Sequence, residues 1–286
     1  MGRPSRKDKV VLPDYSEGIQ IKTEDADPRF NNALARGLAI LRAFQVDDDL
    51  LGNLEIADIC GLPKSTVSRL TFTLLQLGYL KYWPEYGKYE LAAGVVGLAY
   101  PYLVKQPVPP LARPLMVELA ARLRTNVGLG VQEGQSVLYL EYALGEVHPN
   151  RLQRAGFRVP LVRTAMGRAC IAGMHPGDRE RLYDELRSRH RRDWPALQAE
   201  LDGAVEQVQA QGFCIAAGTF NRMTNSVAVP FVHGDGATVM AFNSQASAAV
   251  QTPEILPRNG KRLVELAREV RRLLAQAPAG PSLGRR

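Results

Sequence analysis

The chain has 286 residues, of which 36 are Lys or Arg and 29 are Asp or Glu, so its formal net charge is +7. This length suits two domains with tails, and 45% hydrophobic residues are enough for ordinary soluble cores. No apolar run reaches the ~18 residues of a membrane-spanning helix, and the basic start lacks the apolar region of a signal peptide. We therefore expect a cytoplasmic protein.

The three cysteines, Cys60, Cys170 and Cys214, are far apart, and none stands in a CxxC spacing. The four histidines are also scattered, with no HExxH pair. This pattern predicts buried thiols that act as small hydrophobes, with no disulfide framework, no metal site and no cofactor.

Residues 1–30 mix six basic and six acidic side chains with prolines and little periodicity, which predicts a flexible tail. Two helices are predicted next. In the first, apolar residues recur at helical spacing: Leu34, Leu38, Leu41 and Phe44. Asn53 is placed to cap the second helix, and Gly61 is placed to end it.

A third helix is predicted from about Lys64 to Leu77, with Gly78 placed to stop it. Its apolar stripe consists of Val67, Leu70, Leu74 and Leu77. The opposite side is polar and basic over its N-terminal half and carries Ser65, Ser68, Arg69, Phe72 and Gln76. A hairpin follows, with strands near 79–83 and 88–91 around a turn at 84–87.

Three helices followed by a hairpin predict a winged helix-turn-helix domain over residues 31–91 that binds double-stranded DNA. Between residues 59 and 84 there are three basic side chains and no acidic one, although residues 31–90 carry six basic and seven acidic side chains, a net of −1. Arg69 can fork onto a guanine or a phosphate. We expect the DNA contacts to come from Lys64, Ser65, Thr66, Ser68, Arg69, Phe72 and Lys88. Taken singly, these residues also fit helix caps or a solvated face.

The rest of the chain alternates between helix and strand patterns. A connecting helix and a Pro-rich junction are expected over 92–110, an effector-binding domain over 111–276 and a second flexible tail over 277–286. Within the effector-binding domain, helices are predicted near 111–124, from Thr164, and near 177–190, 196–210 and 258–275, and strands near 126–132, 136–142, 212–216, 226–232 and 237–243. This mixture predicts an α+β fold.

The chain resembles the IclR-type bacterial regulators. Their DNA-binding half is similar to ALARGLAILRAF, LEIADICGLPKSTVSRLTFTLLQLGYL and YGKYELAAGVVGLA, of which GLPKSTVSRL is the most specific piece. Thr71 and Phe72 depart from the family, which usually has Leu and a small residue there. The resemblance continues through GFRVPLVRTAMGRACIAGM and NSVAVPFVHGDGATVMAFNSQ, so it covers about residues 32–275. It implies a GAF-like effector-binding domain, a dimer or dimer of dimers, and control of a catabolic operon.

The turn at Thr164 is the predicted effector site. Thr164 can cap a helix whose first N–H groups favour an anion, and Ala165 and Gly167 leave room for one. In similar proteins this turn lines the pocket together with two polar strands, so we expect a small anionic molecule to contact Thr164, Ala165, Met166, Gly167, Ser226 and Asn243. Either Arg158 or Arg163 can add charge. The alternative is that Thr164 is only a cap and Asn243 an ordinary core amide.

Taken together, these features predict a transcriptional regulator, not an enzyme, whose operator affinity depends on a small organic acid or an aromatic metabolite. A GAF-like enzyme with a thiolate at Cys170 or Cys214 is one alternative, although a thiolate needs a nearby base or cation. A sequence-neutral architectural DNA-binding protein is another, although it needs an extended basic face. The run RERLYDELRSRHRR is expected to be a solvated helix rather than a second nucleic-acid site.

Overall fold

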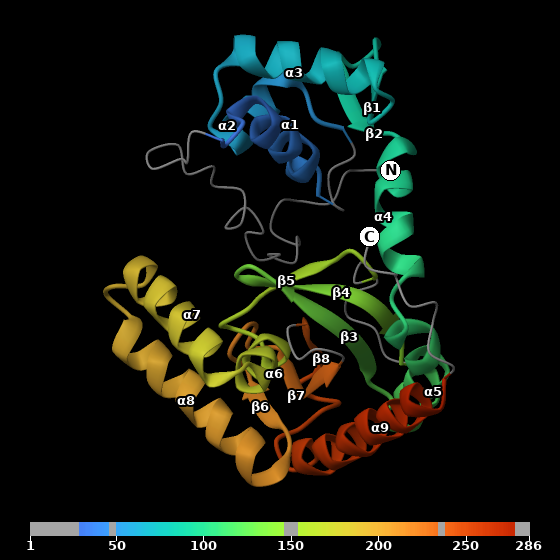
Figure 1. Ribbon diagram of the computed structural model, residues 1–286, viewed down its shortest axis with the longest axis vertical. Helices are drawn as coiled ribbons and strands as arrows, with labels where there is room; N and C mark the ends of the chain where they lie inside the picture. The colour runs from blue at the N-terminus through green and yellow to red at the C-terminus, as the bar shows by residue number, and fades with distance from the viewer. Residues whose placement is uncertain (1–28, 46–49, 146–153, 234–237, 278–286) are drawn as a thin grey trace. The chain divides into compact units, whose positions relative to one another are not determined.

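The computed structural model describes residues 29–45, 50–145, 154–233 and 238–277 (Figure 1). The predicted tails at 1–30 and 277–286 lie almost entirely outside these residues. The contacts divide the chain into two compact units, residues 1–102 and residues 103–286.

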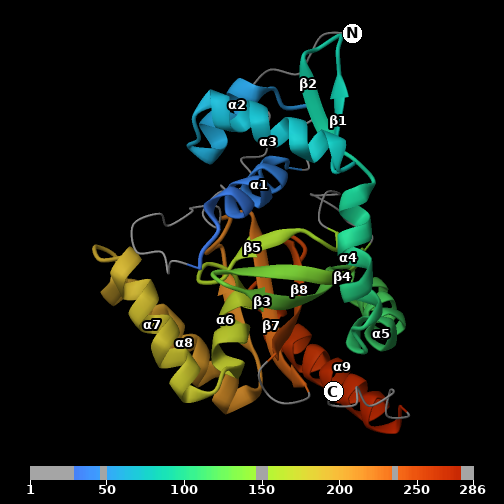
Figure 2. The same cartoon turned by 45° about the horizontal axis from the view of Figure 1, so that its top comes forward.

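The described part of the first unit begins with three helices and one hairpin, in the predicted order. The helices are α1 (Asn32–Ala43), α2 (Asn53–Cys60) and α3 (Lys64–Gln76). The hairpin pairs β1 (Leu80–Trp83) with β2 (Lys88–Leu91) and projects from the helices as a wing (Figure 2). Gly61 and Gly78 both adopt positive φ angles, 62° and 76°, which a glycine reaches without steric cost, and α2 and α3 end there as predicted.

Helix α1 divides its apolar residues between the surface and the core. Leu34 and Leu38 are 63% and 49% exposed, and the helix packs into the core through Ala39, Ile40 and Ala43. Helix α1 packs against both α2 and α3. Leu41 and Phe44 are half-buried and pack against the same core.

The predicted cap of α2 is wrong. Gly52 is the N-cap residue, and Glu55 accepts a hydrogen bond from the Gly52 backbone N–H at 2.6 Å. Asn53 is the first helical residue, and its side-chain oxygen lies 3.2 Å from the Thr71 hydroxyl of α3. The Glu55 carboxylate therefore caps the start of α2, and the Asn53 side chain connects α2 to α3.

Helix α4 (Gly94–Val104) follows the hairpin, where a connecting helix was predicted. The remaining helices are α5 (Val108–Leu123), α6 (Ala165–Gly173), α7 (Pro176–Arg189), α8 (Trp194–Gln211) and α9 (Leu256–Gln276). The remaining strands are β3 (Asn126–Glu133), β4 (Ser136–Ala143), β5 (Arg158–Pro160), β6 (Cys214–Ala217), β7 (Thr224–His233) and β8 (Thr238–Ser247). Strand β5 was not predicted, because its three residues are too short for an alternating pattern.

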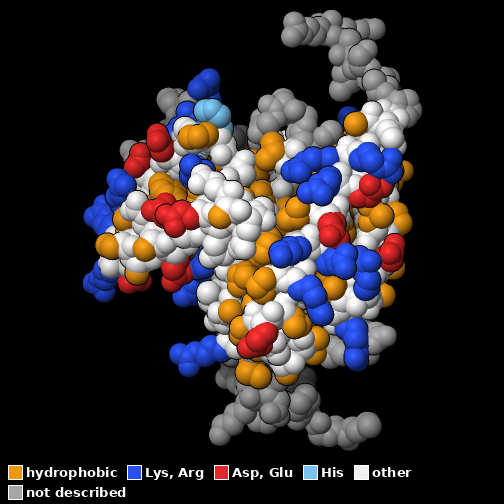
Figure 3. All heavy atoms as spheres, turned by 90° about the horizontal axis from the view of Figure 1, so that it is seen from below, with side chains coloured by type: hydrophobic (Ala, Val, Ile, Leu, Met, Phe, Trp, Pro, Cys, Tyr) orange, Lys and Arg blue, Asp and Glu red, His pale blue; other side chains and the backbone are white. Residues whose placement is uncertain are grey.

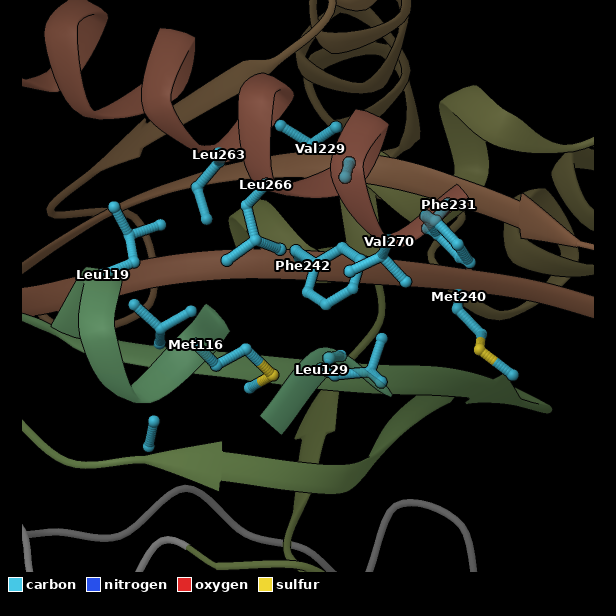
Figure 4. Close-up of a cluster of buried hydrophobic side chains, with 14 of the residues drawn as sticks. Met116, Leu119, Leu129, Val229, Phe231, Met240, Phe242, Leu263, Leu266 and Val270 are labelled. Atoms are coloured by element: carbon cyan, nitrogen blue, oxygen red, sulfur yellow. The ribbon is translucent and has the colours of Figure 1, made fainter. Parts of the chain in front are cut away.

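These six strands form one antiparallel sheet in the order β5-β4-β3-β8-β7-β6. Helices α5 and α9 cover one face, where their apolar side chains meet those of β3, β7 and β8 (Figure 4). The residues that meet there include Met116, Leu119, Leu129, Val229, Phe231, Met240, Phe242, Leu263, Leu266 and Val270. Helix α6 packs against β7 and β8, and α8 packs on α6. The predicted α+β class is confirmed.

Searched over the described residues, no helix combines the length and the apolar character that a membrane span requires.

Candidate DNA-binding surface and ligand pocket

The surface of the first unit that suits DNA is the outer face of α3. Val67 and Leu74 bury the inner face of this helix in the core. Among the predicted contact residues, Lys64, Ser65, Ser68, Arg69 and Phe72 are exposed, and Thr66 is half-buried. The face thus presents hydroxyls, two cations and one aromatic ring, which suit phosphates, base edges and a thymine methyl group.

Thr71, one of the two departures from the pattern of the IclR-type regulators, has a structural role. Its side chain is fully buried, and its hydroxyl lies 3.0 Å from the Val67 carbonyl and 3.2 Å from Asn53 Oδ1. Where a Leu would supply only apolar contact, Thr71 adds a polar contact between α3 and α2. The packing of α2 against α3 in turn determines how the outer face of α3 is oriented.

The lysines of the hairpin are held by acidic partners. Lys88 forms an ion pair with Glu55 at 2.7 Å, and Lys81 pairs with Glu90 at 3.2 Å and lies 3.7 Å above the Trp83 ring. The hydrogen bond from Lys88, with that from the Gly52 N–H, holds the pKa of Glu55 below its usual value. Lys88, predicted to contact DNA, is thus positioned by Glu55.

The second unit contains a hollow of about 380 Å³, its open mouth included, on the α6 side of the sheet. Strands β4, β6, β7 and β8 form its floor, the start of α6 forms one wall, and β5 and residues 219–220 border it. Its lining consists of Tyr139, Val159, Thr164, Ala165, Ala216, Thr219, Phe220, Thr224, Ser226, Asn243 and Gln245. None of these side chains is acidic or basic.

The strand register brings the polar floor together. Ala216 pairs with Ser226, and Ser226 pairs with Gln245, so these residues form one row across β6, β7 and β8. Gly128 allows the Tyr139 ring to lie close over β3, since a Cβ there would stand 2.3 Å from the ring. The register thus builds the floor from strands that are far apart in the sequence.

An amide–phenol chain runs along this floor. The Asn243 amide donates to the Tyr139 hydroxyl at 3.1 Å, and the Gln245 amide donates to the Tyr142 hydroxyl at 3.0 Å. Asn243 also donates to Gln245 Oε1 at 3.3 Å. Burial raises the pKa of both phenols, and the hydrogen bonds from the amides oppose this in part. The N–H groups of the buried Asn243 amide are therefore bonded, whereas its Oδ1 has no hydrogen-bond partner among the described residues, and the residue lines the hollow.

Other polar groups of the hollow differ in whether they are already bonded. Thr164 Oγ1 accepts from the Gly167 N–H at 3.1 Å and donates to the Pro160 carbonyl at 2.9 Å, and Thr219 donates to the Arg163 carbonyl at 3.0 Å. Within the described part of the chain, the hydroxyls of Thr224 and Ser226 have no hydrogen-bond partner. These two hydroxyls, with the first N–H groups of α6, remain for a ligand.

Two of the predicted effector residues do not line the hollow. Met166 is fully buried against the sheet. Gly167 is small for a different reason than expected, because a Cβ there would lie 1.8 Å from the Leu161 carbonyl oxygen. Close packing of α6 on the preceding turn, not space for a ligand, requires this glycine.

Neither candidate arginine enters the hollow. Arg158 forms an ion pair with Glu133 at 2.7 Å, and the exposed Arg163 uses its carbonyl to bind Thr219. The sequence reasoning also missed five residues of the lining: Tyr139, Ala216, Thr219, Phe220 and Thr224. No local signal identifies Tyr139, because its place depends on the pairing of β4 with β3.

The buried thiols have no activating partner among the described residues. Cys170 and Cys214 are fully buried, and burial raises the pKa of both, that of Cys214 to about 12. Arg168, whose charge opposes this effect at Cys214, is itself paired with Glu200 and the Val162 carbonyl. The same part of the chain holds no group of His, Cys, Asp and Glu that could bind a metal ion.

Comparison with known proteins identifies both units. Residues 33–84 match the model of the IclR helix-turn-helix domain, and residues 100–272 match that of the bacterial transcriptional regulator IclR C-terminal domain. The chain is 32% identical over 247 residues to the HTH-type transcriptional regulator TsaQ1/TsaQ2 of Comamonas testosteroni, covering 84% of this chain and 87% of that protein.

Two solved structures share the fold. An IclR family transcriptional regulator from Brucella abortus has a TM-score of 0.78 at 35% identity and covers 93% of this chain and 100% of that one. An IclR homologue from Microbacterium hydrocarbonoxydans, crystallised with 4-hydroxybenzoate, has a TM-score of 0.66 at 22% identity and covers 86% of this chain and 100% of that one.

Proposed function

Because this chain belongs to the IclR family of bacterial transcriptional regulators, we propose that α3 reads a specific operator and that a small organic anion in the hollow modulates this binding. The observation that carries the proposal is the exposed polar face of α3 beside a hairpin wing, in a chain whose second unit holds a polar hollow. The domain limits we propose are 31–91 for DNA binding, 92–110 for the connection and 111–276 for effector binding.

Arg69 is the residue of α3 that we assign to base reading. Its fork geometry can take both acceptors of a guanine, and such a contact discriminates by about 1–3 kcal/mol. Arg69→Ala should lower operator affinity by that amount and relax specificity at one position. The operator is first selected from random duplexes, and affinity is then measured by fluorescence anisotropy at fixed salt.

Arg181→Ala, on the exposed face of α7, is the matched control and should bind as the wild type does. An equal loss for Arg69→Ala on operator and random DNA would reassign Arg69 to a phosphate. Unchanged operator affinity would refute the assignment of α3.

The lining of the hollow narrows the class of effector. It holds aromatic and aliphatic surface from Tyr139, Phe220 and Val159, and no charged side chain. A ligand with several charges would remain unpaired there, and burying an unpaired charge is costly. We therefore assign a monoanion with one aromatic or compact apolar body, whose acid group faces the start of α6 and the hydroxyls of Thr224 and Ser226.

The two free hydroxyls give a test that preserves volume. Benzoate-type acids that raise the melting temperature of the wild type are first found by thermal shift, since a ligand of the native state stabilises it. In a Thr224→Val, Ser226→Ala variant, the ligand affinity should fall about a hundredfold or more, because two hydrogen bonds to a charged group are lost and each is worth about 1.5–3 kcal/mol. Thr238→Val, at the exposed start of β8, is the control. Full retention of affinity in the double variant would place the ligand elsewhere.

We also propose a homodimer or dimer of dimers. Helix α4 is apolar on every side, and Val96, Leu98 and Tyr100 are 70%, 56% and 64% exposed. Such a helix requires a covering surface. Together with the exposed Leu34 and Leu38 of α1, it fits a symmetric contact between copies, which would place two α3 helices on a pseudo-palindromic operator. Sedimentation that shows only monomer, with and without operator, would refute this assembly.

No catalytic role is proposed for the chain. The buried, protonated thiols of Cys170 and Cys214 support a structural role. We further propose that the protein works in the cytoplasm, where a bacterial regulator meets its operator.

A further inference from the structure

Helix α9 carries a concentration of positive charge that neither the core nor the hollow uses. One side of α9 packs on the sheet through Leu263, Leu266 and Val270. Its other side bears Arg258, Lys261, Arg262, Arg268, Arg271 and Arg272, against Glu265 and Glu269. Six basic and two acidic side chains give this helix a net charge of +4. Figure 3 looks onto the face that carries α9, where Lys and Arg side chains gather.

The charge of the chain is therefore unevenly distributed. Its total is +7, whereas residues 31–90 carry six basic and seven acidic side chains, a net of −1. Most of the attraction of a protein for DNA at a distance comes from such charge. Residues 31–90, which are proposed to read the operator, carry no excess of positive charge. Helix α9 carries a net charge of +4 within 21 residues.

Three of the cations on α9 are already engaged. Arg262 pairs with Glu265 at 2.9 Å, Arg272 bonds Glu269 through Nε at 2.8 Å, and Arg271 lies 5.1 Å from the Phe231 ring centroid. Within the described residues, no acidic partner meets the other three, which are Arg258, Lys261 and Arg268. At about 1.5 Å of rise per residue, they extend over about 15 Å of helix.

A rigid array of free cations fits a regular row of anions. Because α9 is anchored by its buried face, the three side chains project from a fixed support, and binding through them costs less backbone entropy than binding through a loop. We propose that α9 is a second DNA-contacting surface, which binds backbone phosphates of the duplex beside the operator and reads no bases. This inference rests on the proposed function, since it requires the operator to be bound already.

The test compares the length dependence of DNA binding in two charge-matched variants of the full chain. The α9 triple variant carries Arg258→Gln, Lys261→Gln and Arg268→Gln. The control variant carries Arg181→Gln, Arg191→Gln and Arg192→Gln, three exposed arginines on and after α7. Each is measured on the bare operator and on duplexes that extend it stepwise on both sides, over a range of salt concentrations. Circular dichroism verifies that both variants fold.

For the wild type and the control variant, flanking DNA should tighten binding and steepen the salt dependence. The α9 triple variant should bind the bare operator as the wild type does but gain nothing from the flanks. Its slope of log K against log salt on long duplexes should be smaller by up to about 2.7, since each phosphate that the protein neutralises adds about 0.9 to the slope.

Two results would overturn the inference. One is identical behaviour of the α9 triple variant and the wild type on every duplex, which would leave α9 as a surface for an acidic protein. The other is an equal loss on bare and extended operators, which would show a general field and no flanking contact. Absence of specific binding by the wild type itself would instead refute the proposed function.

Discussion

Gln251 offers the sharpest test of how the second unit is held together, because its fully buried side chain bonds four groups. Its amide N–H groups donate to the Asn225 and Ser244 carbonyls, both at 3.1 Å. Its Oε1 accepts from Ser244 Oγ at 2.9 Å and from Asn259 Nδ2 at 3.0 Å. Gln251→Leu keeps a similar volume and leaves all four partners buried without this bond.

The expected loss follows from these four bonds. Four hydrogen bonds at about 0.5–1.5 kcal/mol each amount to about 2–6 kcal/mol, and the apolar side chain of Leu recovers part of this. We expect the free energy of unfolding of the second unit to fall by about 3 kcal/mol, which is large for a single substitution. Gln211→Leu is the control, because this exposed glutamine makes one hydrogen bond, to the Phe213 carbonyl at 3.3 Å.

The assay must report on the second unit alone. The chain has two tryptophans, so a Trp83→Phe background leaves only Trp194, which is buried beside Tyr183 in the second unit. Urea unfolding followed by its fluorescence gives the midpoint and the slope separately. A difference below about 1 kcal/mol between Gln251→Leu and the background protein would refute the reasoning that unsatisfied buried groups dominate here.

Three further outcomes are expected. Gly167→Ala should prevent folding of the second unit, since its Cβ would lie 1.8 Å from a backbone oxygen. Gly203→Ala, whose Cβ would have nothing within 4 Å, should instead stabilise α8 by about 0.5–1 kcal/mol. Soluble yield and melting curves distinguish the two outcomes. Glu55→Gln should cost about 0.5 kcal/mol at pH 7, because the pair with Lys88 is largely exposed. Because the folded pKa of Glu55 lies below 4.5, the wild-type advantage is present above that pH and should vanish as the pH falls through the folded value; equal stability differences at pH 7 and pH 3 would contradict this. An aromatic disulfide reagent should modify Cys60 alone in the native protein, and rapid reaction of a second thiol would contradict the burial of the other two.

How far the fold follows from the sequence depends on whether its signals are local. Gly61 and Gly78 end helices through their own backbone freedom, so α2, α3 and the hairpin were predictable in order. The buried side of α1 was not, because Leu34 and Ile40 are both apolar although only Ile40 is buried. Apolar residues recur with the same helical period whether they face the core or a surface that binds a partner.

The pocket shows the same limit at longer range. The cap at Thr164 is a local motif and was predicted, and the alternation along β8 placed Asn243 on one face. Tyr139 reaches the floor only because β4 pairs with β3 through a register shift at Leu129/Gly130. No residue near Tyr139 encodes that shift, so the aromatic part of the lining was missed.

Strand β8 is the element through which a ligand could bias the rest of the second unit. Its Asn243 and Gln245 face the hollow, while Ser244 between them points to the other side and bonds Gln251 and Thr125, the latter at 2.7 Å. Thr125 lies just after the end of α5, whose start follows α4. A ligand alters DNA affinity only if it binds the DNA-competent and the DNA-incompetent arrangements of the protein unequally. The operator must then change the affinity for the ligand by the same factor. If β8 carries the coupling between the ligand and the operator, Gln251→Leu should lower the factor by which each changes the affinity for the other. This should hold even where the affinity for each alone remains near the wild-type value. A Gln251→Leu variant that keeps the wild-type factor would exclude the buried network around Gln251 as the route of the coupling.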